Sequence, residues 1–255
     1  MARKMTRGAH TYLITGAAHR IGRALALGLA KDAAAIYIHH NTSESAAKQL
    51  AQQISKLGAR AFTINANLSS VTQCENLLKR AQDLAGPIDV LINNASVFEE
   101  GELAKITVDD LNHNMMINAY APLLLSRSFA ELNKRSKTAR LPVIINMLDS
   151  RITDYDRQHP AYHLAKRTLF TLTKMMALEF APDVRVNGVA PGLILPPAGK
   201  DQSYLEQLKS TNPLKAIGET EQVVETVRFL VNNEFVTGQV IYVDGGRNLL
   251  SNTYG

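Results

Sequence analysis

A tyrosine and a lysine lie four residues apart, at Tyr162 and Lys166, in a stretch whose apolar pattern predicts a helix over residues 160–180. Residues at that spacing share one helix face. A tyrosine, with an ordinary pKa of about 10, exchanges protons poorly at neutral pH unless a neighbouring cation stabilises its phenolate. Lys166 could supply that cation. The pair therefore predicts proton transfer, and a solvated pair on a surface helix is the alternative.

Two further polar residues accompany this pair. Asp149 stands thirteen residues before Tyr162, directly after a predicted strand at residues 143–147, and Asn118 lies in the helical region before that strand. An ionised carboxylate accepts hydrogen bonds but donates none. Asp149 therefore suits a substrate that presents N–H groups, or one that needs a proton relayed to a ring nitrogen, better than a carbonyl oxygen that must be polarised.

A glycine-containing turn follows the first predicted strand, at residues 10–15, and leads into a predicted helix at 21–31. Small residues such as Gly16 and Gly22 let backbone N–H groups approach a pyrophosphate at the positive end of the helix dipole. We therefore expect a dinucleotide there, and a tight turn without a ligand is the alternative. Arg20 stands where a third glycine is often found, and its guanidinium could pair with phosphate or bind a flat polar ligand over the nicotinamide.

The residues after the second predicted strand, at 35–39, bear on the type of dinucleotide. A carboxylate there would accept hydrogen bonds from the adenosine ribose and select NAD. The chain instead has neutral donors and a histidine that could be partly charged, in the run His39, His40, Asn41, Thr42 and Ser43, with no acid before Glu44. This run favours NADPH, and the absence of an arginine at this point is the counterargument.

These residues are separated by short apolar runs that alternate with longer helical patterns along the chain. The predicted strands lie at 10–15, 35–39, 61–65, 88–92, 143–147, 184–189 and 239–243, and the predicted helices at 21–31, 43–57, 71–84, near 107–135, 160–180 and 219–231. Apolar strands separated by helices of this length indicate parallel strands covered on both faces. We predict an α/β protein, a single domain over 1–255 with a doubly wound, seven-stranded parallel sheet of the Rossmann type. Ligands of such sheets bind beyond the carboxyl ends of the strands.

The composition of the 255 residues excludes several classes of protein. A single cysteine, Cys74, allows neither an intrachain disulfide nor a cysteine zinc cluster, so we expect a reducing, cytoplasmic location and no metal site. No apolar run approaches the roughly 18 residues of a membrane span, and the start of the chain lacks the apolar stretch of a secretion signal. The net charge is +5, but the Lys and Arg residues are scattered singly along the chain, which argues against a nucleic-acid partner. Residues 1–9 are expected to form a flexible arm.

Motifs in order along nearly the whole chain resemble those of the short-chain dehydrogenase/reductase family. They are Thr15-Gly16, Ile21-Gly22, Asn93-Asn94-Ala95, Asn118, Tyr162 with Lys166, Arg185-Val186-Asn187, Pro191-Gly192 and Asp244-Gly245-Gly246. The resemblance implies that Tyr162 exchanges the proton and that Lys166 lowers the pKa of Tyr162 and binds the ribose. It also implies that Asn118 holds a water that links Lys166 to solvent.

One departure from the family narrows the resemblance. Asp149 replaces the usual serine, and together with Arg20 and the segment from Asn93 to Phe98 it resembles the pteridine reductase branch, which includes bacterial alternative dihydrofolate and dihydromonapterin reductases. The resemblance implies a pterin held between the nicotinamide and Phe98, with packing under a loop as the alternative role of that ring. The substrate-binding residues expected from it are Arg20, Ser96, Phe98, Asp149 and Tyr162.

The same resemblance implies where NADPH and partner subunits bind. The expected cofactor residues are Gly16, His19, Arg20, Ile21, Gly22, His40, Asn41, Thr42, Asn67, Leu68, Asn94, Ala95, Ser96, Tyr162, Lys166, Pro191, Gly192, Leu193 and Ile194. Residues 193–213 are expected to form a substrate lid with a short helix near 203–208. A homotetramer is expected through the 160–180 helix and the last helix and strand, and the tail at 247–255 could reach a neighbouring site.

The function expected from these residues is NADPH-dependent reduction of a pterin or folate, by hydride transfer to a ring C=N with protonation assisted by Tyr162, Asp149 and Lys166. Two alternatives stay open. One is a carbonyl-reducing relative that acts on a 3-oxoacyl or sugar substrate. The other is an NADPH-binding regulatory module without catalysis.

Overall fold

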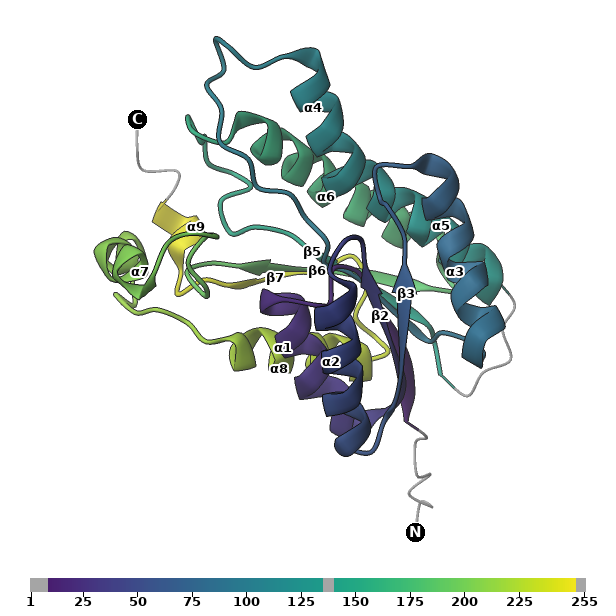
Figure 1. Ribbon diagram of the computed structural model, residues 1–255. Coiled ribbons are helices and arrows are strands. Elements are labelled where there is room, and N and C mark those ends of the chain that lie inside the picture. The colour runs from purple at the N-terminus through teal and green to yellow at the C-terminus, as the bar shows by residue number, and fades with distance from the viewer. Residues whose placement is uncertain (1–8, 135–139, 251–255) are drawn as a thin grey trace.

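The computed structural model describes residues 9–134 and 140–250, and the sheet that runs through them contains seven parallel strands (Figure 1). The strand order is β3-β2-β1-β4-β5-β6-β7. The chain therefore winds outward from β1 to β3, returns to place β4 beside β1, and winds outward in the other direction. The carboxyl ends of β1 and β4, where this reversal occurs, are the usual ligand site of doubly wound sheets. The predicted fold class is confirmed.

The strands agree closely with the apolar runs of the sequence. They are β1 (His10–Ile14), β2 (Ala33–His40), β3 (Arg60–Asn65), β4 (Val90–Asn93), β5 (Val143–Met147), β6 (Arg185–Pro191) and β7 (Val240–Val243). Every residue of β1, β4 and β5 is buried. These central strands are apolar on both sides because helices cover both faces of the sheet.

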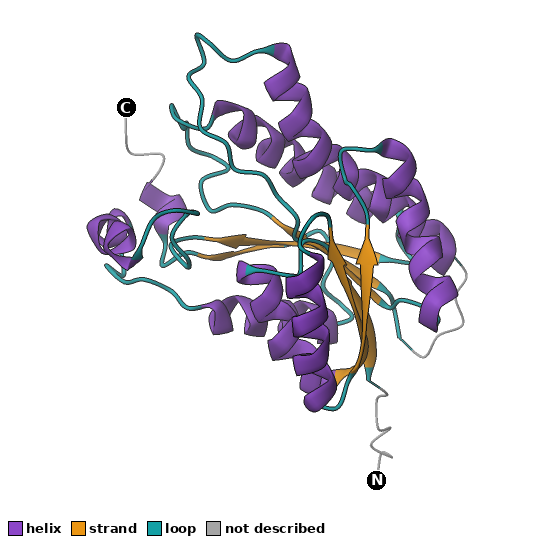
Figure 2. Cartoon of the chain, in the orientation of Figure 1, coloured by secondary structure: helices purple, strands orange, loops and turns teal. Residues whose placement is uncertain are grey.

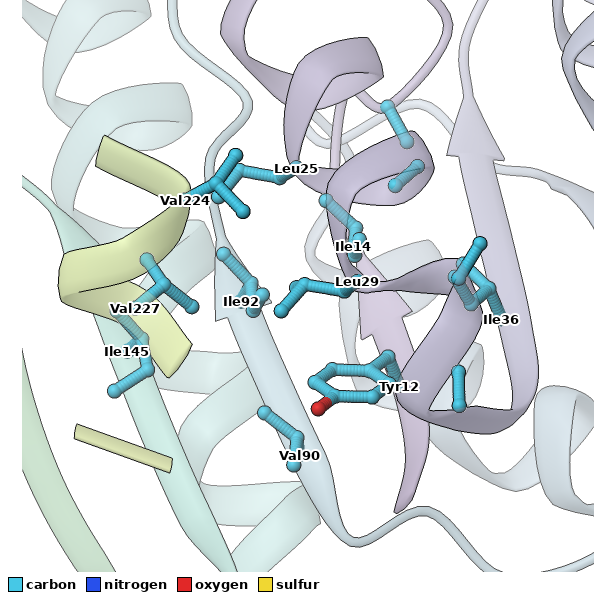
Figure 3. Close-up of a cluster of buried hydrophobic side chains, with 14 of the residues drawn as sticks. Tyr12, Ile14, Leu25, Leu29, Ile36, Val90, Ile92, Ile145, Val224 and Val227 are labelled. Carbon is cyan, nitrogen blue, oxygen red and sulfur yellow. The ribbon is translucent and has the colours of Figure 1, made fainter. Parts of the chain in front are cut away.

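Successive side chains of a strand point to opposite faces, and each face has its own core. Tyr12 and Ile14 of β1 pack with Leu25, Leu29 and Val224 on one face (Figure 3). Leu13 packs into the second core, on the opposite face. The first face is covered by α1 (Arg20–Leu29), α2 (Glu44–Lys56) and α8 (Thr220–Asn232), and the second by α3 (Val71–Ala85), α5 (Ala121–Asn133) and α6 (Pro160–Glu179) (Figure 2). A 3-10 turn at Ala30–Asp32 follows α1.

The helical region predicted near 107–135 is interrupted. It consists of α4 (Val108–Met115), a π-helical turn at Met116–Tyr120, and α5. Thr107 and Asp110 form a capping box at the start of α4. Pro122 has no N–H to donate, so the regular hydrogen-bond ladder cannot pass through it. The resulting wider turn holds Asn118, in keeping with the tendency of such turns to occur at functional sites.

The expected lid contains the predicted short helix, here α7 (Gln202–Leu208), followed by a 3-10 turn at Lys209–Thr211. A short helix that the sequence pattern did not predict, α9 (Arg247–Leu250), follows β7 and lies near α7 (Figure 1). The expected flexible arm at 1–9, save its last residue, and the end of the tail at 251–255 lie outside the described residues. Within the ranges given above, no helix is both long and apolar enough to span a membrane.

Candidate active site

Asp149, Tyr162 and Lys166 come together where β5 ends and α6 begins. The hydroxyl of Tyr162 donates to Oδ2 of Asp149 at 2.8 Å, and the backbone N–H of Arg151 donates to Oδ1 of Asp149 at 2.7 Å. The ammonium of Lys166 donates to the carbonyl of Met147 at 2.7 Å and lies 5.7 Å from the centre of the Tyr162 ring. The spacing that predicted a shared helix face therefore brings Tyr162 and Lys166, both buried, together with the half-buried Asp149.

The electrostatics of this cluster follow from burial and from the carboxylate. Burial and the charge and hydrogen bond of Asp149 raise the pKa of Tyr162 well above its usual value, so the hydroxyl stays protonated at neutral pH. Burial lowers the pKa of Lys166 to about 8, against the opposing effect of Asp149. The family resemblance implied a lowered pKa for Tyr162. Burial, together with the Asp149 carboxylate that stands where the family usually has a serine, raises that pKa instead.

Asn118 fixes the segment that leads to Phe98. Its Oδ1 accepts hydrogen bonds from the Ser96 hydroxyl at 2.9 Å and the Val97 N–H at 3.0 Å, and its Nδ2 donates to the Val97 carbonyl at 3.0 Å and to Asn114 at 3.3 Å. An asparagine side chain has two acceptor and two donor positions. All four are used here, so only the backbone of Asn118 is left for the water that the resemblance implied.

Phe98 lies at this cluster with an aromatic neighbour on each of two sides. Its ring meets the Tyr162 ring edge-on, with centroids 4.7 Å apart, and stacks on the His159 ring at 3.9 Å and an interplanar angle of 15°. Phe98 remains 45% exposed, which argues against the alternative of a packing residue under a loop. The sequence analysis did not single out His159. Its position three residues before Tyr162 at a helix start was the signal available.

The glycine turn after β1 is built for close backbone approach. Gly16 has φ +60°, and a Cβ there would lie 2.9 Å from Cα of Ala95. A Cβ on Gly22 would lie 2.4 Å from the Gly16 carbonyl oxygen. Asn94 closes the turn by donating to the carbonyls of Thr15 at 2.8 Å and Gly16 at 3.2 Å. The turn between β1 and α1 is thus fastened to the end of β4, where the strand order reverses.

His39 also holds this turn. The N–H of Gly16 donates to Nδ1 of His39 at 3.1 Å, so Nδ1 is unprotonated and the proton of the neutral ring sits on Nε2, which donates to the Ala66 carbonyl at 3.0 Å. Burial lowers the pKa of His39 to about 4. His39 is therefore an uncharged link between the turn and the end of β3, which removes it as the partly charged histidine considered for a phosphate.

The remaining predicted cofactor residues fall into two groups. Exposed side chains belong to His19, Arg20, Asn41 and Thr42, whereas His40 is buried and its Nδ1 lies 3.3 Å from the Asn41 carbonyl. Three apolar side chains are buried, so only their backbone could meet a cofactor: Leu68, Leu193 and Ile194. Ile21 packs against the first core.

The other residues of that prediction lie at strand ends. Asn67 holds its own turn, because its Oδ1 accepts from the N–H of Ser69 at 3.0 Å and its hydroxyl at 2.8 Å. The Pro191 carbonyl accepts from the Ser150 N–H at 3.0 Å, which ties β6 to the loop of Asp149. A Cβ on Gly192 would lie 2.7 Å from Cα of Asp244, so the chain passes close to the end of β7 there.

Arg20 connects the glycine turn to the expected lid. It has φ +53°, a left-handed conformation that favours glycine and is strained for other residues. Its guanidinium donates from Nη2 to the carbonyl of Pro196 at 2.7 Å. A guanidinium has five N–H donors, so donors remain for a ligand. Within the described part of the chain, no group of three or more His, Cys, Asp or Glu side chains is placed to hold a metal ion.

Two solved structures have a similar fold over nearly the whole chain. The FolM alternative dihydrofolate reductase 1 of Brucella canis, complexed with NADP, is 31% identical, with a TM-score of 0.86 and 94% of each chain covered. The corresponding protein of Brucella suis, also in complex with NADP, is 30% identical, with a TM-score of 0.85 and coverage of 94% of this chain and 95% of that one.

Sequence comparison gives a broader range of relatives. The 3-oxoacyl-[acyl-carrier-protein] reductase of a Synechocystis species is 30% identical over 93% of this chain and 96% of that protein. A short-chain type dehydrogenase/reductase of Picea abies is 29% identical over 94% of this chain and 93% of that protein. The family described as enoyl-(acyl carrier protein) reductase matches residues 16–248. With these matches and the Tyr162–Lys166 site at the edge of its parallel sheet, the chain belongs to the short-chain dehydrogenase/reductase family.

Proposed function

We propose that this protein is an NADPH-dependent reductase of a pterin or folate. The observation that carries the proposal is the hydrogen bond of 2.8 Å from Tyr162 to the carboxylate of Asp149. A carbonyl reductase needs donors around the substrate oxygen, whereas a carboxylate that only accepts suits the N–H groups of a pterin. The likeness to two alternative dihydrofolate reductases, each with NADP, supports both parts of the proposal.

The glycine turn fits a dinucleotide. Backbone N–H groups at the start of the ten-residue helix α1 and the absence of side chains at Gly16 and Gly22 leave room for a pyrophosphate. NADPH, when bound, supplies the hydride. The residues after β2 favour NADPH over NADH, because the exposed Asn41 and Thr42 carry no negative charge and the first acid, Glu44, pairs with Lys48 at 2.6 Å. Lys166, still mainly charged at neutral pH, would hold ribose hydroxyls.

The reaction adds one hydride and one proton across a ring C=N, which becomes CH–NH. Tyr162 is protonated in this site and relays a proton to the ring nitrogen, directly or through a water. It regains a proton from solvent, because its raised pKa does not let the phenolate persist. Asp149 orients the Tyr162 hydroxyl and accepts from N–H groups of the substrate. Phe98 stacks on the flat heterocycle, and the free donors of Arg20 bind its polar edge or the cofactor phosphates.

The lid and the assembly belong to the same proposal. The contact of Arg20 with Pro196 supports residues 193–213 as a lid beside the glycine turn. A homotetramer is supported by exposed apolar side chains on the two expected surfaces, among them Met175 and Leu178 of α6 and Phe229 of α8. A cytoplasmic location is proposed because the chain has one cysteine, Cys74, which is buried and free.

A carbonyl-reducing activity is the second candidate, because relatives of about 30% identity include 3-oxoacyl-[acyl-carrier-protein] reductases. Spectrophotometric assays of NADPH oxidation with dihydrobiopterin, dihydrofolate, dihydromonapterin and an acetoacetyl thioester separate the two. We expect turnover with at least one pterin and none with the thioester. Turnover of the thioester alone would contradict the proposal, and binding of NADPH without turnover of any substrate in the panel would favour a non-enzymatic module.

A further inference from the structure

His159 covers one face of the Phe98 ring. The two rings are nearly parallel, with 3.9 Å between their centroids, and His159 is only 8% exposed while Phe98 is 45% exposed. The Tyr162 ring stands almost perpendicular to the Phe98 ring, at 86°. Because His159 covers one face of Phe98, a flat ligand can stack only on the opposite face. Phe98 is therefore already stacked on His159 in the protein without a ligand.

The imidazole of His159 is itself anchored. Its Nδ1–H donates to Oδ2 of Asp156 at 3.2 Å, and the same oxygen accepts from Nη1 of Arg151 at 3.2 Å. Oδ1 of Asp156 accepts from the backbone N–H groups of Gln158 at 2.8 Å and His159 at 3.2 Å. Burial acts to raise the pKa of Asp156, but these hydrogen bonds and the neighbouring positive charge leave it below its usual value. The anchor is therefore an ionised carboxylate with four polar contacts.

We propose that His159, held by Asp156, is a positioning residue that fixes the Phe98 ring as a stacking platform for a flat heterocyclic substrate. The inference rests on the proposed function in one respect, since that function gives Phe98 its ligand. It adds a residue that touches neither the reacting atoms nor the glycine turn. The competing reading is that His159 only fills space at the start of α6.

Kinetics of three variants distinguish these readings. Aromatic stacking of this kind corresponds to about a 2- to 12-fold change in an equilibrium constant. His159→Ala is expected to raise KM for the pterin within that range, with kcat and the Kd for NADPH within twofold of the wild type. His159→Phe keeps a stacking ring without the Asp156 bond and is expected to restore KM in part. Lys56→Ala, at an exposed position at the end of α2 on the other face of the sheet, is the control and leaves all three constants unchanged.

A readout without substrate separates this inference from the proposed function. With 4-fluorophenylalanine at the seven Phe positions, Phe98→Leu identifies the Phe98 signal in ¹⁹F NMR. His159→Ala is expected to shift that signal because the stacked ring is lost, whereas the control Lys56→Ala is expected to leave it unchanged. A shifted signal in a protein that reduces no pterin would sink the proposed function but keep the positioning role. An unshifted signal with an unchanged KM would overturn the positioning role.

A further variant covers the case in which His159→Ala does not fold. Asp156→Asn keeps both rings and the backbone contacts of the anchor but removes the carboxylate charge from the imidazole and Arg151. We expect a broadened or displaced Phe98 signal and a rise in KM of no more than that expected for His159→Ala. An unchanged Phe98 signal in a folded Asp156→Asn protein would refute the anchoring step.

Discussion

Replacing Asp149 with asparagine tests the central assignment of the site. The substitution keeps the shape of the side chain and an oxygen for the Arg151 N–H, but it removes the charge that accepts from Tyr162 at 2.8 Å. A hydrogen bond to a charged group contributes about 1.5–3 kcal/mol. If that interaction is realised in the transition state, kcat for the pterin falls about 10- to 150-fold.

The pH profile gives the same variant a second signature. Asp149 raises the pKa of Lys166, which burial lowers to about 8. Without the carboxylate the pKa of Lys166 falls further, so the alkaline limb of the activity profile moves to lower pH. The Kd for NADPH is measured at pH 6.5, where Lys166 is charged in both proteins, and we expect it to stay within twofold of the wild type.

Steady-state measurement of NADPH oxidation gives kcat, and the change in the fluorescence of NADPH itself gives its Kd, because the chain has no tryptophan. Asp149→Ser restores the usual family residue and serves as a companion, with a similar or larger loss of pterin turnover expected. Full activity of Asp149→Asn, together with an unmoved alkaline limb, would refute the role assigned to the carboxylate. An equal loss of NADPH binding and turnover would show that the substitution damaged the cofactor site instead.

Three further outcomes follow from the structure. In Gly22→Ala the new Cβ would lie 2.4 Å from the Gly16 oxygen. We therefore expect the free energy of unfolding, measured by urea denaturation, to fall by about 1–3 kcal/mol, and NADPH binding, measured by fluorescence titration, to weaken. A wild-type Kd for NADPH would contradict the tight turn. Leu178 is 83% exposed on α6, and Leu178→Arg is expected to lower the mass found by light scattering while the circular dichroism spectrum stays unchanged; an unchanged mass would place the interface elsewhere. The pKa of Lys166 is about 8 in the folded protein and about 10.5 when unfolded. NADPH binding, followed by titration, should therefore weaken above pH 8, whereas the contribution of Lys166 to stability, followed by thermal melts, should rise between pH 8 and 10.5. A Lys166→Met protein should lose both pH trends.

Much of the site could be predicted because its residues follow strands. Asp149, two residues after β5, and Gly16, two residues after β1, reach the same edge of the sheet once the strands are parallel. Tyr162 and Lys166 share a helix face by spacing alone. Each of these placements depends on local periodicity and on the rule that ligand sites lie at the carboxyl ends of parallel strands. They can therefore be predicted without knowledge of the packing.

Other features depend on contacts between distant segments. His39 ends up as a neutral link because Gly16 and Ala66 present a donor and an acceptor on its two sides. His159 becomes important only because the loop carrying Phe98 returns to the start of α6. The sequence distances involved are 23, 27 and 61 residues, and no local pattern reports them.

The amino-acid sequence by itself determined the order of strands and helices, the parallel sheet, and the membership of Asp149, Tyr162 and Lys166 in one site. Hydrophobic periodicity and the reach of a helical turn are local, so they can be read along the chain. The tertiary structure alone decided how the protons are held. Burial together with the carboxylate of Asp149 raises the pKa of Tyr162, whereas the cation of Lys166 in the sequence had suggested a lowered one. Protonation depends on desolvation and on charges within a few ångströms, and those are properties of the packed molecule.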